Sequence, residues 1–391
     1  KDLLAAIKRV RSRRQLVAMV QKLHQEQVWV LFSLWADQDF GDATQIIAQL
    51  DQAGLGLPDR DYYLDKKPRS EKIRAAYLEH VRRMLQLAGF SKGKAKRAAK
   101  QILAIETQLA KASKTRVQRR DPKGMYNKTA IAELAKKQRR VAWKAYFKAL
   151  GLPSVRAANV TAPSFFEEVD KMLAKVRIGH WRSYLTWHVL QDYASTLGKP
   201  FVDESFKLRQ LLTGQKKQRP RWKRCVAATD GALGELLAQP FVKKRFSEQA
   251  KKDVTMMVGA ISSVFSEHVK ALPWMDDKTR ALAEAKRQRM AFLIGYPNKW
   301  KQYPFEVGAS YAKNARAARR HELIRQLKKI GKPVDHGEWE MSPPTVNAYY
   351  HPNKNHMVFP AGILQPPFYS EKAGLAVNMG GMGMVVGHEL T

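Results

Sequence analysis

The chain contains 391 residues, a length that allows two or three domains of ordinary size with a large core. Hydrophobic residues make up 45% of it, which excludes an intrinsically disordered protein. It has no apolar run of about eighteen residues, so the sequence predicts no membrane-spanning helix. The first residues, Lys1 to Leu4, do not resemble a signal peptide, and the single cysteine, Cys225, excludes an internal disulfide framework.

The charge is unusual, because 70 Lys and Arg residues stand against 35 Asp and Glu residues and give a formal net charge of +35. Such an excess is typical of proteins that bind nucleic acids or anionic surfaces. The densest basic runs are 92–100, 136–140 and 216–224, and none is interleaved with repeated aromatic residues that could stack on bases. We interpret them as solvated helix faces and expect no specific nucleic-acid partner. The alternative is a non-catalytic basic helical protein that binds nucleic acid or anionic surfaces.

The first fifty residues are predicted to be largely helical. Apolar residues recur three and four positions apart from Leu3 to Leu23. Residues 27–40 are richer in β-branched and aromatic side chains and predict either a strand or a buried helix. Glycine and proline end this pattern at 54–58.

Helical periodicity returns over 70–111, with a break at Gly89, and recurs in later segments up to a Gly-Lys-Pro stop at 331–333. His188 lies among apolar positions one helical turn apart, such as Trp181, Tyr184 and Leu185. This pattern predicts a packed core histidine rather than a metal ligand.

After Pro333 the pattern changes. Residues 344–350 and 356–360 predict two strands, and a helix is predicted to begin near Gly380. His351 and His356 flank the turn between the strands and are expected to be surface histidines. We therefore expect a mainly α protein, with a helical lobe over residues 1–335 and the opening of an α+β lobe over 336–391.

The last residues, 386–391, read Val-Gly-His-Glu-Leu-Thr. In the motif H-E-x-x-H, two histidines one helical turn apart hold the same zinc ion, and the glutamate acts as a general base on water. The second histidine would fall one position beyond Thr391. The sequence therefore holds the first half of this motif.

Other segments precede the half-motif in a recognisable order: Asn347-Ala348-Tyr349-Tyr350, then 358–369 and 378–383. Together with His388-Glu389 they resemble the neprilysin-like zinc metallopeptidases, the M13 family, in its bacterial oligopeptidase branch. Scattered matches at 56–63, 120–127 and 219–222 extend the resemblance over most of the chain.

The resemblance implies roles for particular residues. His388 would be the first zinc ligand, and Glu389 the general base that passes a proton from water to the leaving amine. Asn347 and Ala348 would bind the substrate backbone by strand addition. Four residues match positions that line the apolar pocket for the residue after the cut, although ordinary core packing explains them equally well: Ile363, Phe368, Met384 and Val385.

It also implies a function: a zinc-dependent endopeptidase, with one Zn²⁺, that hydrolyses oligopeptides on the amino side of hydrophobic residues. The α+β lobe would be the start of a thermolysin-like zinc-protease lobe. The second histidine and a downstream glutamate ligand do not occur in the 391 residues, so we expect the chain as given to be inactive. Family members are commonly exported or membrane-anchored. We therefore expect an extracytoplasmic location, in the periplasm or cell envelope, with membrane association only through a missing N-terminal segment.

Overall fold

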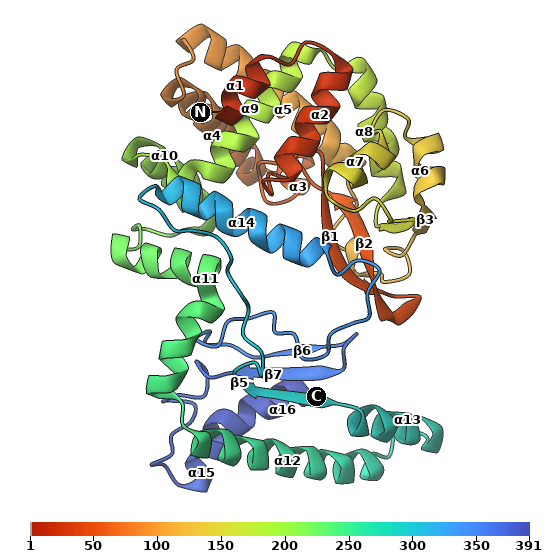
Figure 1. Ribbon diagram of the computed structural model, residues 1–391, viewed down its shortest axis with the longest axis vertical. Helices are drawn as coiled ribbons and strands as arrows, with labels where there is room; N and C mark the ends of the chain where they lie inside the picture. The colour runs from red at the N-terminus through yellow and green to blue at the C-terminus, as the bar shows by residue number, and fades with distance from the viewer. Residues whose placement is uncertain (1) are drawn as a thin grey trace. The chain divides into compact units, whose positions relative to one another are not determined.

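The computed structural model describes residues 2–391. They form two compact units, neither of which is continuous in sequence. The first contains the residues up to Arg219 together with Phe305–Pro333, and the second contains Pro220–Pro304 and Val334–Thr391. Figure 1 shows the elements of both units, and the expected mainly α fold is confirmed.

The grouping of segments differs from the single boundary expected near residue 335. Strand β5 (Ala291–Gly295) pairs in parallel with β7 (His356–Pro360), from Ala291 opposite His356 to Gly295 opposite Pro360. This pairing draws the preceding helices into the second unit. Whether the lobes of the family follow the same division stays a prediction.

Helices make up most of the first unit. They are α1 (Asp2–Lys8), α2 (Arg13–His24), α3 (Asp61–Leu64), α4 (Pro68–Leu87), α5 (Lys92–Ala112), α6 (Ile131–Lys137), α7 (Trp143–Ala149), α8 (Pro163–Lys175), α9 (Ile178–Tyr193), α10 (Lys199–Thr213) and α14 (Tyr311–Leu327), with short 3₁₀ turns η1 (Gln118–Arg120) and η2 (Ala194–Thr196). The start of α2 follows from its sequence: Ser12 accepts a hydrogen bond from the Gln15 amide, and the Gln15 side chain accepts one from the Ser12 amide.

A four-stranded sheet lies in the same unit, in the order β1-β2-β4-β3. Its strands are β1 (Phe32–Asp39), β2 (Asp42–Gln52), β3 (Lys128–Ala130) and β4 (Ala157–Val160). The strand alternative for residues 27–40 is therefore correct, whereas helix over the following residues is wrong. Residues 46–51 of β2 are buried without alternation, so their periodicity could not distinguish a strand from a buried helix.

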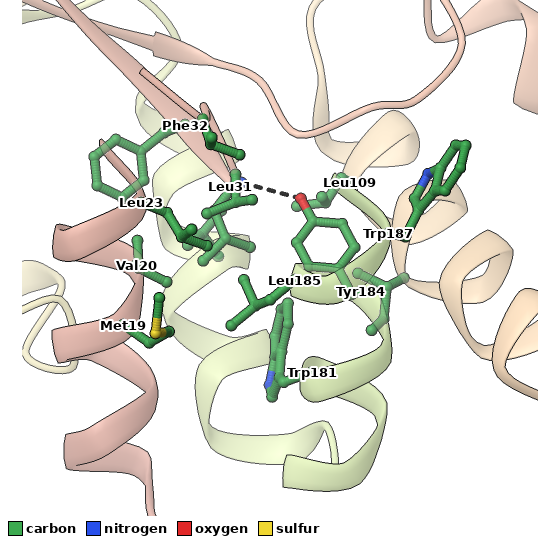
Figure 2. Close-up of a cluster of buried hydrophobic side chains, with 14 of the residues drawn as sticks. Met19, Val20, Leu23, Leu31, Phe32, Leu109, Trp181, Tyr184, Leu185 and Trp187 are labelled. Atoms are coloured by element: carbon green, nitrogen blue, oxygen red, sulfur yellow. Dashed lines mark hydrogen bonds between the residues drawn. The ribbon is translucent and has the colours of Figure 1, made fainter. Parts of the chain in front are cut away.

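Tyr184 of α9 connects the residue before β1 with the loop after β2 through two hydrogen bonds. Its hydroxyl donates to the carbonyl oxygen of Gly54 at 2.9 Å. It also accepts from the amide of Leu31 at 3.0 Å, as Figure 2 shows. A Cβ atom on Gly54, whose φ is +83°, would lie 2.3 Å from that hydroxyl oxygen. Gly54 is therefore required both by its backbone conformation and by this close approach.

A buried carboxylate joins α5 to α3 and α4. Glu106 is fully buried and accepts hydrogen bonds from the hydroxyls of Tyr63 at 2.9 Å and Tyr77 at 2.8 Å. The Tyr63 hydroxyl in turn accepts from the amide of Leu57 at 2.8 Å. Nε2 of His188 lies 3.1 Å from Oε1 of Glu106, and His188 is buried, so its prediction as a core histidine is confirmed.

His24, at the end of α2, is a second buried histidine of this unit. Its Nε2 lies 2.9 Å from the carbonyl oxygen of Val30, and its Nδ1 lies 2.7 Å from the hydroxyl oxygen of Tyr146. Because a carbonyl can only accept, Nε2 carries the proton, and neutral Nδ1 accepts from Tyr146. Burial lowers the pKa of His24 to about 4.

The second unit is built on a three-stranded sheet in the order β5-β7-β6, with β6 (Tyr349–His351) antiparallel to β7. Helices α11 (Arg221–Arg245), α12 (Glu248–Ala271), α13 (Asp277–Gln288), α15 (Leu375–Asn378) and α16 (Met384–Leu390) complete it, with the π turn η3 (Met379–Gly383) between the last two. Helix α12 packs against β5, η3 and α16. The two strands predicted after Pro333 are confirmed, although β6 begins five residues later than predicted.

The expectation that His356 lies on the surface is wrong. Its side chain is fully buried, because β7 is the central strand and all five of its residues are buried. Nδ1 of His356 lies 3.2 Å from the carbonyl oxygen of His336, and burial lowers the pKa of the ring to about 4. His351 is half-buried, and its Nε2 lies 3.2 Å from a carboxylate oxygen of Glu340.

None of the helices within residues 2–391 combines the length and the apolar character needed to cross a membrane.

The buried neutral state of His24 predicts an acid-sensitive first unit. The unfolded histidine, with a pKa near 6.5, binds a proton between pH 6.5 and about 4 while the folded one does not, so the free energy of unfolding falls as the pH falls through this window. The loss reaches roughly 3 kcal/mol. Chemical denaturation across pH 4–7 measures it, and His24→Gln is expected to flatten the slope. An equal slope in the variant would contradict the assignment.

Candidate active site

His388 and Glu389 lie on the last of three consecutive helical segments. Residues 375–378 form α15, 379–383 form the π turn η3, and 384–390 form α16. The predicted helix is therefore present and starts five residues before Gly380. π turns within α-helices frequently mark functional sites, because the extra residue changes the direction of the side chains that follow.

Gly381, within η3, lies directly against the backbone of Phe368. A Cβ atom built on Gly381 would be 2.3 Å from the carbonyl oxygen of Phe368, far inside van der Waals contact. No side chain fits at this position without moving the backbone. Because Gly381 has no side chain, the helical segment that leads to His388 can lie directly against the backbone of Phe368.

Asn378 holds the same segment through its side chain. Its Oδ1 accepts from the amide of Ser370 at 3.0 Å, and its Nδ2 donates to the carbonyl oxygen of Ser370 at 3.0 Å. The hydroxyl of Tyr369 donates to Asp253 of α12 at 2.9 Å. Residues 368–370 are therefore held from both sides, by the helix that leads to His388 and by α12.

The predicted peptide-binding edge begins at Asn347. Asn347 is exposed and Ala348 is buried, as expected for neighbouring residues of an extended segment, and together they lead into β6. β6 pairs with β7 on one side, and no other strand among residues 2–391 pairs with it. An edge strand with unpaired backbone groups can accept a peptide as an additional strand.

Gly362 sets the position of the chain just before this edge. A Cβ atom on Gly362 would lie 2.3 Å from the carbonyl oxygen of Pro344 and 2.6 Å from that of Thr345. The amide of Gly362 also donates to the carbonyl oxygen of Pro343 at 2.7 Å. The backbone of residues 343–345 therefore rests on Gly362, two residues before Asn347.

The helix of His388 and the edge strand belong to the same unit and touch: α16 packs against β6. Ala348, Ile363 and Val385 are all buried in one hydrophobic cluster of this unit, and Phe368 is partly buried against it. Met384 differs, because 60% of its side chain is exposed. The structure thus brings Ile363, Phe368 and Val385 to one core but not Met384, and the role of all four in binding substrate stays a prediction.

His388 is exposed and Glu389 is half-buried. Within residues 2–391, no group of three or more His, Cys, Asp or Glu side chains is arranged to hold a metal ion. An accessible imidazole next to a carboxylate on one helix turn fits one zinc ligand and its general base, and a zinc site needs further ligands.

Sequence reasoning overlooked three residues that position this site: Gly362, Gly381 and Asn378. All lie within the segments that match the family pattern, and the glycine spacing at 380–383 was the available signal. Their partners could not be read from the sequence, because Pro344, Phe368 and Ser370 are brought to them by the fold.

Comparisons with known proteins agree with this geometry. Models of peptidase family M13 match residues 1–297 with the N-terminal domain and residues 347–391 with the peptidase domain. Human endothelin-converting enzyme 1 is 34% identical over 378 residues, which cover 92% of this chain and 49% of that protein. A homolog of this enzyme from Locusta migratoria is 32% identical over 385 residues and is covered to 52%.

Solved structures give the same result. The Mycobacterium tuberculosis zinc metalloprotease Zmp1, in complex with an inhibitor, matches with a TM-score of 0.93 and 32% identity, over all of this chain and 59% of that one. PepO from Lactobacillus rhamnosis HN001 matches with a TM-score of 0.88 at 23% identity, over all of this chain and 62% of that one, and so shares the fold.

The family models and the solved structures place the fold of this chain among those of the zinc metallopeptidases. More specifically, the chain belongs to peptidase family M13. It spans about half the length of the curated relatives it matches.

The contact at Gly362 predicts a cost for adding one methyl group. Gly362→Ala is expected to destabilise the second unit by about 1–3 kcal/mol, because a backbone carbonyl must move to make room. Gly259→Ala in α12 is the matched control, since a Cβ atom there meets nothing within 4 Å. Chemical denaturation of the complete natural protein measures both. Equal effects in the two variants would show that the approach of residues 343–345 is not tight.

Proposed function

We propose that this chain is part of a zinc-dependent endopeptidase that hydrolyses oligopeptides on the amino side of hydrophobic residues. The observation that carries the proposal is the packing of α16, which bears His388 and Glu389, against β6, the strand entered from Asn347 and Ala348. The carboxylate proposed to activate water and the edge proposed to bind the peptide are thus neighbours within one unit.

The peptide would lie along the free edge at Asn347. The Asn347 amide side chain and the backbone of Ala348 would hydrogen-bond to the main chain of the substrate, which holds it extended. An extended peptide presents each carbonyl group at a fixed spacing, so a grip at this edge also places the scissile bond.

His388 would supply one imidazole ligand, through a neutral ring nitrogen. When bound, zinc would polarise the scissile carbonyl and lower the pKa of a water molecule. Glu389 would accept the proton of that water during its attack and deliver it to the departing amine nitrogen. Its position next to His388 on the same helix turn supports this role.

The preference for a hydrophobic residue after the cut rests on the side chains around Phe368. Phe368 is only partly buried and Met384 is largely exposed, whereas Ile363 and Val385 are buried in the hydrophobic cluster against which Phe368 packs. A large apolar side chain placed against Phe368 and Met384 would remove further apolar surface from water, at about 25 cal/mol per Å².

Other parts of the proposal rest on resemblance. The names of the relatives, a converting enzyme and a zinc metalloprotease, support peptide substrates. The proposal of an extracytoplasmic location rests on the resemblance to the family, whose members are commonly exported or membrane-anchored. Because residues 2–391 supply one imidazole at this site, we also propose that they hold zinc weakly and are inactive by themselves.

The test uses the complete natural protein and two pairs of substitutions. Glu389→Gln is expected to lower kcat by roughly 10²–10⁴-fold with zinc retained, because the general base is lost. His388→Ala is expected to lose zinc as well. Hydrolysis of an internally quenched oligopeptide measures activity, and elemental analysis of the dialysed protein measures zinc.

The chain offers matched controls in Glu267→Gln and His268→Ala, a neighbouring Glu-His pair exposed on α12. Both controls should keep zinc and activity. Full activity in Glu389→Gln would contradict the proposed base, and full zinc occupancy in His388→Ala would contradict the proposed ligand.

A further inference from the structure

The exposed charged side chains of helix α5 are all cations. It carries the cations Lys92, Lys94, Lys96, Arg97, Lys100 and Lys111. Its single carboxylate, Glu106, is fully buried and already accepts hydrogen bonds from two tyrosines. No acidic side chain of α5 therefore offsets these charges at the surface.

Three of these cations form what we call the lysine row: Lys92, Lys96 and Lys100. They recur every four residues, so they lie on one face of α5, with about 5–6 Å between their Cβ atoms. All three are exposed, and no carboxylate among residues 2–391 forms an ion pair with them. Like charges at this spacing repel one another, which favours an anion that binds to all three.

Cations on the neighbouring helices are arranged differently. In α4, Arg82 forms a bidentate ion pair with Glu79. Arg83 of α4 and Lys207 of α10 both pair with Glu204, at 2.8 Å and 3.2 Å. The charges of Arg82, Arg83 and Lys207 are thus offset by carboxylates, unlike those of the lysine row.

The lysine row borders a hollow between α4 and α5 with a volume of about 290 Å³. Leu78, Glu79 and Arg82 line its opposite side. Since Glu79 is already paired with Arg82, the net charge around the hollow comes from the lysine row. The hollow has room for roughly ten water molecules at 30 Å³ each, enough for one phosphate-bearing headgroup.

An exposed apolar side chain lies next to this charge. Leu87, the last residue of α4, is 42% exposed, and Phe90, in the turn before α5, is partly buried against the core with its ring centroid 4.8 Å from Nζ of Lys94. Membrane surfaces bind this combination, because cations reach the lipid phosphates while an apolar side chain enters the headgroup layer. A nucleic-acid backbone offers no such apolar layer.

We propose that the lysine row and residues 87–90, at the junction of α4 and α5, form a docking site for membranes rich in anionic phospholipids. This site lies in the first unit and needs no zinc or proteolysis. It holds the enzyme at a lipid surface through α5 itself.

The experiment measures binding of the complete natural protein to vesicles by cosedimentation at about 0.15 M ionic strength, where bulk electrostatic attraction is screened beyond about 8 Å. Vesicles of phosphatidylglycerol with phosphatidylcholine are compared with pure phosphatidylcholine. Wild-type protein is expected to bind only the former. The variant Lys92→Gln/Lys96→Gln/Lys100→Gln is expected to bind about 100-fold more weakly, at roughly fivefold per lysine.

Because the whole chain is strongly positive, the control variant removes the same three charges at another place in the first unit. Lys136→Gln/Lys144→Gln/Lys148→Gln does so on α6 and α7 of the same unit, where all three lysines are exposed. It is expected to bind within a few-fold of wild type. Thermal unfolding of both variants shows whether either one fails to fold. Should the α5 variant fail, Lys96→Gln alone is used and is expected to show the fivefold loss.

Each other outcome overturns the proposal. Equal losses in the two triple variants would mean that diffuse charge, not the lysine row, holds the vesicles. Absence of wild-type binding to phosphatidylglycerol would remove the site. Displacement from vesicles by inorganic phosphate would identify a free anion as the ligand, and preferential binding of a short DNA duplex to the lysine row would identify nucleic acid.

Discussion

The second unit depends on two places where one stretch of backbone lies against another with no room for a Cβ atom. At Gly381 the helix that leads to His388 meets the carbonyl group of Phe368, and at Gly362 the loop after β7 meets the carbonyl groups of Pro344 and Thr345. The contact at Gly381 sets the distance between the helical segment that leads to His388 and the backbone of Phe368. The contact at Gly362 sets the position of residues 343–345, which lead to Asn347. Both halves of the candidate site are therefore positioned by backbone contact, which is stiffer than a contact between side chains.

The sequence predicts this unit well where the chemistry is local. His388-Glu389 and Asn347-Ala348 could be found as short linear patterns, and the helix and strands around them follow from periodicity and turn residues. Pairing between distant segments could not be predicted. β5 joins the sheet of β7 across sixty intervening residues, from Gly295 to His356, and this ladder, together with the packing of α12 against η3 and α16, brings the preceding helices into the unit.

The errors share a physical cause, which is burial without alternation. Residues 46–51 of β2 are buried on both faces, so the sequence there did not show the alternation of apolar and polar residues that indicates a strand. His356 was misjudged for the same reason, since every residue of β7 is buried and a polar residue in it has no exposed side. Buried polar residues in other elements are stabilised by hydrogen bonds, as His24 of α2 is by those to Val30 and Tyr146.

The large positive charge divides into two physical classes. Many cations are held by carboxylates, as Arg316 is by Glu26, Arg119 by Asp51 and Lys128 by Asp39, and these bridges join distant segments of the first unit. The lysine row of α5 has no such partner. A single figure for net charge therefore conceals the difference between cations that stabilise the fold and cations that are left to bind something else.

The central claim is that His388 and Asn347 serve one site. Crystals of the complete natural protein, grown with zinc and an extended peptide that ends in a zinc-binding hydroxamate, would test it by anomalous diffraction at the zinc edge. The account predicts zinc about 2.0–2.1 Å from a ring nitrogen of His388, and the peptide hydrogen-bonded to Asn347 and Ala348 along the β6 edge. Zinc bound away from His388, or a peptide bound elsewhere than at this edge, would contradict it.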